Sequence, residues 1–410
     1  MFDKPTVFIL GAGASWHYGY PTGEELVKMV IERSSFLGNF CRESPDAGNT
    51  FLPEYVNRKV TGTSPYPVNL NEAWQRVSQE CKDLETRLKQ VNPPVIDYFL
   101  GQNPELQEIG KLIIALAILE CESIYLRRGG NINRIKHLQN LPLRSERQMP
   151  DDVIDTEYND NWVRFVLYHL VSNCNTSADL LANNVTFVTF NYDISFEYKL
   201  YSGLSHIERF RSEHVDTFFN DGRILHIYGK IKDRPPLDSH SLNLEAIPLG
   251  GKMPAEYNSD SRRFHMDCQK LLDNAYHASV GLRVISEDKG LDNDVIKLAS
   301  DAIHKAVHVY ILGYGFDENN SNRLELTTHL KARSGSYPQV FFTNFEDRNS
   351  VNKKASRLFS GGPGNFLPPK SIYEPFVQGS ASDSADKVGI GYFEKSTRNV
   401  YDALERDFEL

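Results

Sequence analysis

The sequence has no long run of lysine and arginine, although its 410 residues include 45 basic side chains. The 54 acidic side chains give a net charge of −9 at neutral pH. A nucleic-acid backbone attracts proteins through gathered positive charge, so direct nucleic-acid binding is not expected. The length allows one large domain with an insertion, or two domains, around a substantial core.

Paired cysteines are also missing. The sequence forms no C-x-x-C pair, and the histidines form no H-E-x-x-H pair, which argues against a metal site and against a secreted disulfide framework. We therefore expect no bound metal and the reduced cysteines of a cytoplasmic protein. The five cysteines are Cys41, Cys81, Cys121, Cys174 and Cys268.

Hydrophobic stretches long enough to cross a membrane are absent as well. The most apolar stretch, residues 112–119, is bounded by Lys111 and Glu120 and falls short of the roughly 20 residues that a crossing needs. The N-terminus has neither the basic region nor the cleavage site of a signal peptide. We expect a soluble protein with no membrane partner.

The N-terminus does contain a pattern typical of phosphate binding. Residues 6–10 (TVFIL) read as a strand, and the loop that follows is GAGAS at Gly11–Ser15. Thr22 and Glu25 have the spacing of a capping box, which predicts a helix start just after the loop. Small residues let a ligand approach the backbone, and a helix N-terminus attracts an anion.

The rest of the chain alternates between helical and strand patterns. Helical spacing occurs at 71–90, 104–128 and 161–171, and again at 294–306 and 322–332. Short apolar runs typical of strands covered on both faces occur at 185–190, 223–228, 308–312 and 339–343. The alternation of strand and helix in the last third predicts right-handed crossovers and a parallel sheet.

These patterns predict an α/β fold with a Rossmann-like parallel sheet and a large helical insertion. The Rossmann-like domain comprises residues 1–38 and 181–395, and the helical insertion comprises residues 39–180. A C-terminal helix or tail follows at 396–410.

Two common nucleotide-binding motifs do not fit the first glycine loop. The dehydrogenase fingerprint G-x-G-x-x-G/A needs a small third residue, and here that position is Trp16. No second strand ending in Asp or Glu follows about 20 residues later. A P-loop is excluded because no Gly-Lys-Ser/Thr follows.

Polar residues at the ends of later strands are better candidates for a ligand site in this fold. Asn191 and Asp193 follow one strand in the segment TFNYD, His226 lies near the end of another, and Gly313 opens a second glycine turn. Open α/β sheets bind ligands at the carboxyl ends of their strands, so these residues are candidates for one site.

Four motifs in this order resemble the sirtuin-like NAD-binding superfamily. That superfamily carries a GAG-x-S loop, a Thr-x-Asn-x-Asp segment, a His-Gly strand end and a later Gly-x-[GS] turn. Here the corresponding segments are GAGAS at 11–15, TFNYD at 189–193, HIYG at 226–229 and GYG at 313–315. The resemblance covers the Rossmann-like portion and leaves the helical insertion unmatched.

Two departures separate the chain from protein-deacylating sirtuins. Their four-cysteine zinc module would fall between His226 and Gly313, where only Cys268 is present. The segment after the loop is GYPTG at 19–23, without the Phe-Arg pair of deacylases. The chain looks more like the bacterial defence proteins that hydrolyse NAD, and most like the sirtuin-like partner of a HerA-type hexameric ATPase.

This resemblance implies an activity and a setting. The chain would be an NAD glycohydrolase (NADase) that uses NAD as its substrate, needs no metal and depletes NAD in anti-phage defence by abortive infection. It would form a homo-oligomer and act with the HerA-type ATPase.

The resemblance also implies roles for individual residues. The loop and the start of the next helix would hold the pyrophosphate, and the later glycine turn would flank the adenosine half. One amide and one imidazole side chain would take part in cleaving the nicotinamide–ribose bond. Asn191 would fix the ribose hydroxyls or the water, His226 would take a proton, and Asp193 would bind the carboxamide or orient a neighbour. The remaining binding residues would be Gly11, Ala12, Gly13, Ser15, Thr22, Tyr228, Gly313, Tyr314, Gly315 and Phe316.

The presumed base departs from the family pattern. Family members usually have His directly before the glycine, where this chain has Tyr228, with His226 two residues earlier. Residues two apart in a strand share a face, so both side chains are expected to point into one pocket. Two alternatives stay open: a non-catalytic module that senses NAD or ADP-ribose, and a deacylase without the zinc module.

Overall fold

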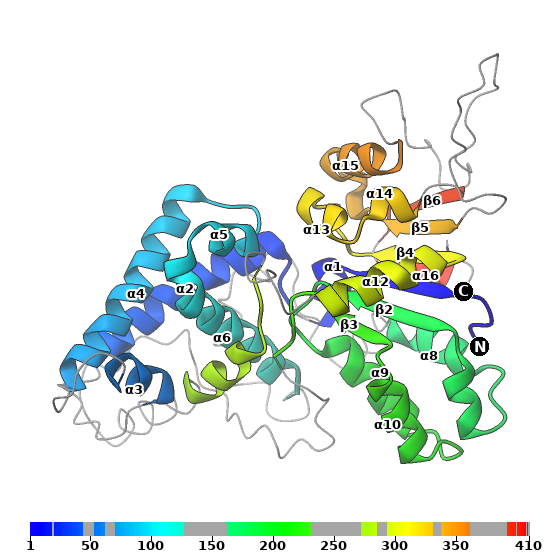
Figure 1. Ribbon diagram of the computed structural model, residues 1–410, viewed down its shortest axis with the longest axis horizontal. Helices are drawn as coiled ribbons and strands as arrows, with labels where there is room; N and C mark the ends of the chain where they lie inside the picture. The colour runs from blue at the N-terminus through cyan, green and yellow to red at the C-terminus, as the bar shows by residue number, and fades with distance from the viewer. Residues whose placement is uncertain are drawn as a thin grey trace, which may run out of the picture.

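The computed structural model describes residues 1–18, 20–43, 53–61, 70–126, 162–231, 272–284, 293–330, 338–360, 392–398, 400–406 and 408. These residues form two lobes, one made of helices and one built around a sheet (Figure 1). The chain begins in the sheet lobe, passes through the helical lobe and returns.

The sheet has six parallel strands in the order β3-β2-β1-β4-β5-β6. This is the doubly wound order, in which the direction of progression across the sheet reverses between β1 and β4. The predicted α/β fold with a Rossmann-like parallel sheet is confirmed. The strands are β1 (Thr6–Leu10), β2 (Val185–Thr189), β3 (Ile224–His226), β4 (His308–Leu312), β5 (Gln339–Thr343) and β6 (Tyr392–Ser396).

An aromatic ladder crosses the middle of the sheet at one level. The ring of Phe8 stacks on Phe187 at 5.2 Å and on Tyr310 at 4.9 Å, and Tyr310 stacks on Phe341 at 4.8 Å between centroids. These four residues are direct partners in the register of the sheet. Cross-strand aromatic pairs of this kind add stability and hold the register.

The register brings the ends of the central strands to one level. Thr189 pairs with both Leu10 and His226, and Leu10 also pairs with Leu312. The loops after β1, β2, β3 and β4 therefore leave the sheet side by side. Their edge of the sheet faces the helical lobe (Figure 1).

The helices of the sheet lobe confirm part of the predicted pattern. The helix expected at 322–332 is instead two short helices, α13 and α14, because Glu325 between them has a left-handed φ of 48°. The helices are α8 (Val163–Val171), α9 (Ser195–Ser205), α10 (Ser212–Asn220), α12 (Asn293–Lys305), α13 (Glu318–Arg323), α14 (Leu326–His329), α15 (Asn349–Ser360) and α16 (Val400–Arg406).

The helical lobe, or helical module, comprises α2 (Gly23–Glu43), α3 (Glu54–Thr61), α4 (Leu70–Val91), α5 (Ile96–Gln102) and α6 (Gln107–Leu126). A later helix over 272–280 also lies in this lobe, where the Tyr276 ring is 5.8 Å from the Tyr55 ring of α3 (Figure 1). Helix α2 packs against α4 and α6 and runs without a break through the boundary predicted at residues 38 and 39. Residues 112–119 of α6 are buried. Arg33 and Glu120 form a buried ion pair between α2 and α6 with an Nε–Oε2 distance of 2.6 Å.

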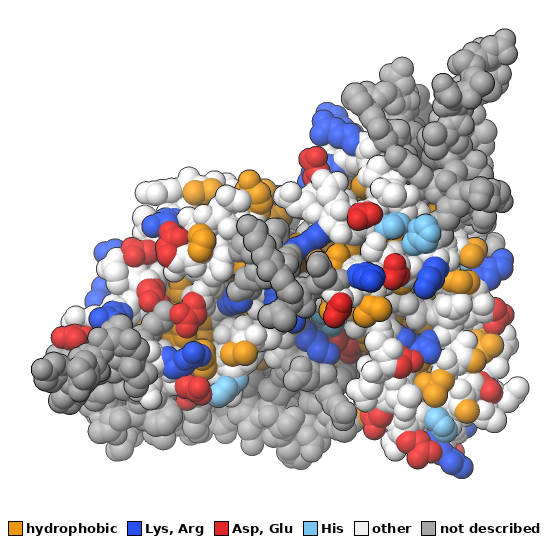
Figure 2. All heavy atoms as spheres, viewed as in Figure 1, with side chains coloured by type: hydrophobic (Ala, Val, Ile, Leu, Met, Phe, Trp, Pro, Cys, Tyr) orange, Lys and Arg blue, Asp and Glu red, His pale blue; other side chains and the backbone are white. Residues whose placement is uncertain are grey.

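The surface charge of the described residues is mixed in sign. Figure 2 shows lysine and arginine side chains interspersed with acidic ones over the described residues of this face, without a large area of one sign. None of the helices among the described residues has both the length and the apolar character to cross a membrane. Cys41, Cys81, Cys121 and Cys174 are free and buried, and Cys268 lies outside the described residues.

Candidate functional site

The glycine loop after β1 packs directly against the glycine turn after β4. The amide of Gly11 donates to the carbonyl of Leu312, and that of Gly13 donates to the carbonyl of Gly313, both at 3.0 Å. A Cβ on Gly11 would lie 2.5 Å from the Gly313 oxygen, and one on Gly13 would lie 2.8 Å from the Gly313 Cα. The small residues that suggested ligand approach are therefore required by contact between the two loops.

The first loop continues into a short helix, α1 (Ala12–Ser15). The carbonyl of Gly11 accepts from the Ala14 amide at 2.9 Å. Beyond α1, the amide and the hydroxyl of Thr22 donate to Glu25 at 2.7 and 2.8 Å, so the predicted helix start just after the loop is confirmed. Thr22 is thus engaged by its own helix.

Asn191 connects the loop after β2 to the glycine loop. Its side-chain Nδ2 donates to the Gly11 carbonyl at 3.1 Å and to the Ser15 hydroxyl at 2.8 Å. The residue is only 9 % exposed, and its Oδ1 is buried without a hydrogen-bond partner. A buried acceptor left unpaired costs about 1–3 kcal/mol, and this oxygen keeps its full capacity to accept a hydrogen bond.

Asp193 joins the same cluster from two residues further on. Its Oδ1 accepts from the Ser15 hydroxyl and from the Ser195 amide, each at 3.0 Å, and also from the Ser195 hydroxyl. Burial raises the pKa of Asp193, and the hydrogen bonds from Ser195 and Ser15 act against that rise. The carboxylate therefore ties the glycine loop to the start of α9.

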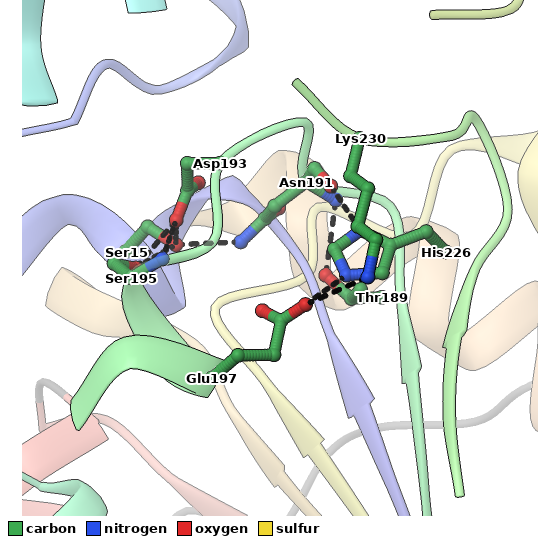
Figure 3. A network of polar contacts seen from close by, with 8 residues as sticks. All are labelled: Ser15, Thr189, Asn191, Asp193, Ser195, Glu197, His226 and Lys230. Atoms are coloured by element: carbon green, nitrogen blue, oxygen red, sulfur yellow. Dashed lines mark hydrogen bonds and ion pairs between the residues drawn. The ribbon is translucent and has the colours of Figure 1, made fainter. Parts of the chain in front are cut away.

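His226 is the last residue of β3 and lies beside the backbone of Asn191 (Figure 3). Its Nδ1 contacts the Asn191 carbonyl at 3.1 Å, and its Nε2 contacts the Glu197 carboxylate at 2.6 Å. Both ring nitrogens are therefore engaged by groups of the protein, one by a backbone carbonyl and one by a carboxylate.

Glu197 is a buried carboxylate that both His226 and Lys230 approach. Burial acts to raise the pKa of Glu197, but the charge of His226, its hydrogen bond and the charge of Lys230 outweigh burial and leave the pKa lowered. The Lys230 ammonium is 3.9 Å from the same carboxylate oxygen. His226 and Glu197 are both buried, so their contact is well shielded from water.

The structure thus brings Asn191, Asp193, Ser15 and His226 into one connected network at the carboxyl edge of the sheet (Figure 3). The Asn191 side chain points toward Ser15, whereas its backbone carbonyl points toward His226. The amide and the imidazole are therefore neighbours whose side chains point in different directions.

Three other predicted binding residues belong to a buried aromatic layer. Tyr228 donates its hydroxyl to Asn320, and the Tyr314 hydroxyl is 3.1 Å from that of Ser321. Phe316 packs against Phe342 in an edge-on contact. Burial raises the pKa of both tyrosines. Gly315 differs, since a Cβ there would meet no atom within 4 Å.

The expectation that His226 and Tyr228 share a strand face was wrong. Strand β3 ends at His226, and the next two residues form a turn closed by a 3.3 Å bond from the Gly229 amide to the His226 carbonyl. The alternation of a strand therefore stops before Tyr228. The two side chains reach different partners, Glu197 and Asn320.

Several residues of the network were not predicted. Glu197 and Ser195 lie in the first turn of α9, and the indole of Trp162 donates to the Ala14 carbonyl at 2.7 Å. The sequence offered one signal for Ser195 and Glu197, since they are polar residues two and four positions after Asp193. Nothing local in the sequence connects Trp162 to the glycine loop.

Among the described residues, no group of three histidines, cysteines or acidic residues is arranged to hold a metal ion. His304 and His308 have the four-residue spacing that would place both on one helix face. Helix α12 ends at Lys305 and β4 begins at His308, so the pair spans a junction instead.

Comparisons of the chain with protein-family models, with curated proteins and with solved structures found no match. The order of the strands shows a doubly wound α/β fold, which carries a helical module. The polar network at its carboxyl edge is the feature that points to a function.

Proposed function

We propose that the protein is an NAD glycohydrolase that cleaves the nicotinamide–ribose bond of NAD to give nicotinamide and ADP-ribose. The observation that best supports the proposal is the buried, unpaired Oδ1 of Asn191. It lies beside the glycine loop, at the strand edge where doubly wound sheets bind nucleotides. A ribose hydroxyl or a bound water is the kind of donor that this oxygen would accept.

The proposed reaction needs no metal or external cofactor. The bond between the ribose C1′ and the positively charged nicotinamide nitrogen breaks, and its electron pair neutralises the ring. A water oxygen then bonds to C1′, and one proton is released. Because the transition state carries positive charge on the ribose, the buried Glu197 carboxylate, whose pKa is lowered, favours it.

His226 is the residue that we propose takes the water proton. Its Nδ1 contacts the Asn191 carbonyl and its Nε2 contacts the Glu197 carboxylate, so both ring nitrogens are already engaged by the protein. This engagement also supports a second candidate function, a module that binds NAD without turning it over.

An incubation with NAD distinguishes the two functions. We expect the purified full chain to release nicotinamide and ADP-ribose in equal amounts, measured by chromatography over time. Binding of NAD in a calorimeter without nicotinamide release would contradict the enzyme and favour the sensor. Neither binding nor release would contradict both.

Glu197→Gln provides a test of the buried carboxylate. The variant keeps an acceptor near Nε2 of His226 but removes the negative charge that favours the positively charged transition state. We expect the rate of nicotinamide release to fall about tenfold. The matched control is Glu208→Gln on the exposed surface, which should leave the rate unchanged. An unchanged rate in Glu197→Gln would contradict the proposed role of the carboxylate.

The wider setting belongs to the same proposal. The four ordered motifs support a homo-oligomeric defence protein that depletes NAD during phage infection with a HerA-type ATPase partner. That setting rests on the motif resemblance alone. Adding such an ATPase to the NAD incubation and following the rate of nicotinamide release tests it.

A further inference from the structure

The helical module makes a buried contact with the segment that carries the candidate site. Tyr192 lies between Asn191 and Asp193, and its hydroxyl donates to the carboxylate of Asp97. Asp97 is in the first turn of α5, far from Tyr192 in the sequence. Both side chains are buried, so the contact is shielded from water.

Helix α5 is firmly fixed in the module. Phe99 and Leu100 are buried, and α5 packs against both α2 and α6. A Cβ on Gly110 of α6 would lie 2.5 Å from a methyl group of Leu100, which shows how closely the two helices approach. A displacement of the module would therefore carry Asp97 with it.

Tyr192 is equally well fixed on the sheet side. Its carbonyl accepts from the Ile231 amide at 3.1 Å, and its ring lies 6.3 Å from the ring of Tyr228. Its neighbours in the chain are the two residues that bond to Ser15. The Asp97 contact thus acts on the middle of the segment that holds the amide and the carboxylate.

We propose that Asp97 is a positioning residue: through Tyr192 it holds the segment Asn191–Ser195 in place, so that the position of the helical module sets the rate of nicotinamide release. The catalytic part of this statement rests on the proposed NAD hydrolysis. The mechanical part concerns the segment itself and is measured without any reaction.

The charge of Asp97 gives the contact a pH dependence. Burial raises the pKa of Asp97 to about 6, while the Tyr192 hydrogen bond and the charge of Arg323 oppose the rise and Asp317 adds to it. Tyr228 also faces this group. A hydrogen bond to a carboxylate is about twice as strong as one to a neutral acid, so the hold on Tyr192 weakens as the pH falls through about 6.

Hydrogen exchange of the full chain tests the mechanical part. In Asp97→Ala and in Tyr192→Phe we expect the Ser195 amide, which bonds to Asp193, to exchange about tenfold faster, as expected for the loss of one buried hydrogen bond. The double variant should exchange no faster than either single one. Glu72→Gln on the exposed face of α4 is the control and should leave the rate unchanged. Unchanged exchange in both single variants would overturn the proposal.

Turnover tests the catalytic part. We expect kcat for nicotinamide release to fall about tenfold in Tyr192→Phe with KM within a factor of two, because the segment is misplaced while NAD still binds. Asp97→Asn keeps an acceptor for Tyr192 but cannot titrate. We therefore expect kcat of the natural chain to fall as the pH drops through about 6, and kcat of Asp97→Asn to show no such fall.

The same variant has an expected effect on stability. Burying a carboxylate with a raised pKa destabilises the fold above that pKa, so Asp97→Asn should unfold at no lower temperature than the natural chain at pH 7.5.

The two proposals fail in different ways. If the natural chain releases no nicotinamide, the proposed function fails, and exchange at Ser195 still decides whether Asp97 holds the segment. If exchange accelerates while kcat and its pH profile stay unchanged in a chain that does hydrolyse NAD, Asp97 has only a structural role and the positioning proposal is overturned.

Discussion

Asn191→Ala is expected to lower nicotinamide release by at least about a hundredfold, the usual cost of removing one preorganised polar group from a reacting centre. The substitution removes the buried Oδ1 that would accept from NAD or water, and also the Nδ2 that bonds to Gly11 and Ser15. Initial rates at saturating NAD give the measurement. A rate within threefold of the natural chain would contradict the site assignment.

Stability separates this loss from unfolding. Alanine forfeits two hydrogen bonds, each with a net contribution of about 1 kcal/mol, but it also removes an acceptor that is buried without a partner. These effects oppose each other, so the free energy of unfolding should fall by only about 1 kcal/mol. Asn220→Ala, on the exposed end of α10, is the matched control and should keep both activity and stability.

The sequence predicts the central strands because their patterns are local. β1, β4 and β5 have the predicted bounds, since each is a short apolar run that ends where a glycine or polar residue begins. β6 was not predicted, because its sequence YFEKS contains charged residues at two of five positions and has no long apolar run. It is identified by its pairing with β5 alone.

The end of β3 shows why the candidate site was only partly predicted. The apolar and aromatic pattern continues to Tyr228, but pairing with β2 stops at His226, where the partner strand also ends at Thr189. The length of a strand depends on the strands that pair with it, and the sequence of one segment does not contain that information. The placement of Asn191, Asp193 and His226 at one edge followed from topology and could be predicted.

The contacts of those residues could not be predicted in the same way. The Glu197 carboxylate reaches His226 because α9 begins at Ser195, two residues after Asp193, and places Glu197 in its first turn. The pair Asp97 and Tyr192 depends on how the helical module docks on the sheet lobe. Such pairs are set by tertiary packing, which cannot be predicted from the spacing of residues along the chain.

Gly313→Ala is expected to lower the free energy of unfolding by about 3 kcal/mol, from left-handed strain and overpacking together. Gly313 has a φ of 60°, and a Cβ there would lie 2.1 Å from the Ala14 nitrogen and 2.3 Å from the Gly13 carbonyl carbon. Both are backbone atoms, so no side chain can rotate away. The two glycine loops have to separate, which breaks the bond from Gly13 to Gly313.

Gly315→Ala is the matched control, two residues further along the same turn. A Cβ at Gly315 meets nothing within 4 Å, so its unfolding free energy should stay within about 0.5 kcal/mol of the natural chain. Denaturant unfolding without NAD measures both variants. If the glycines served only the approach of a ligand, Gly313→Ala would weaken NAD binding and leave the NAD-free stability unchanged. Contact between the loops requires the stability itself to fall, and NAD binding to fall with it.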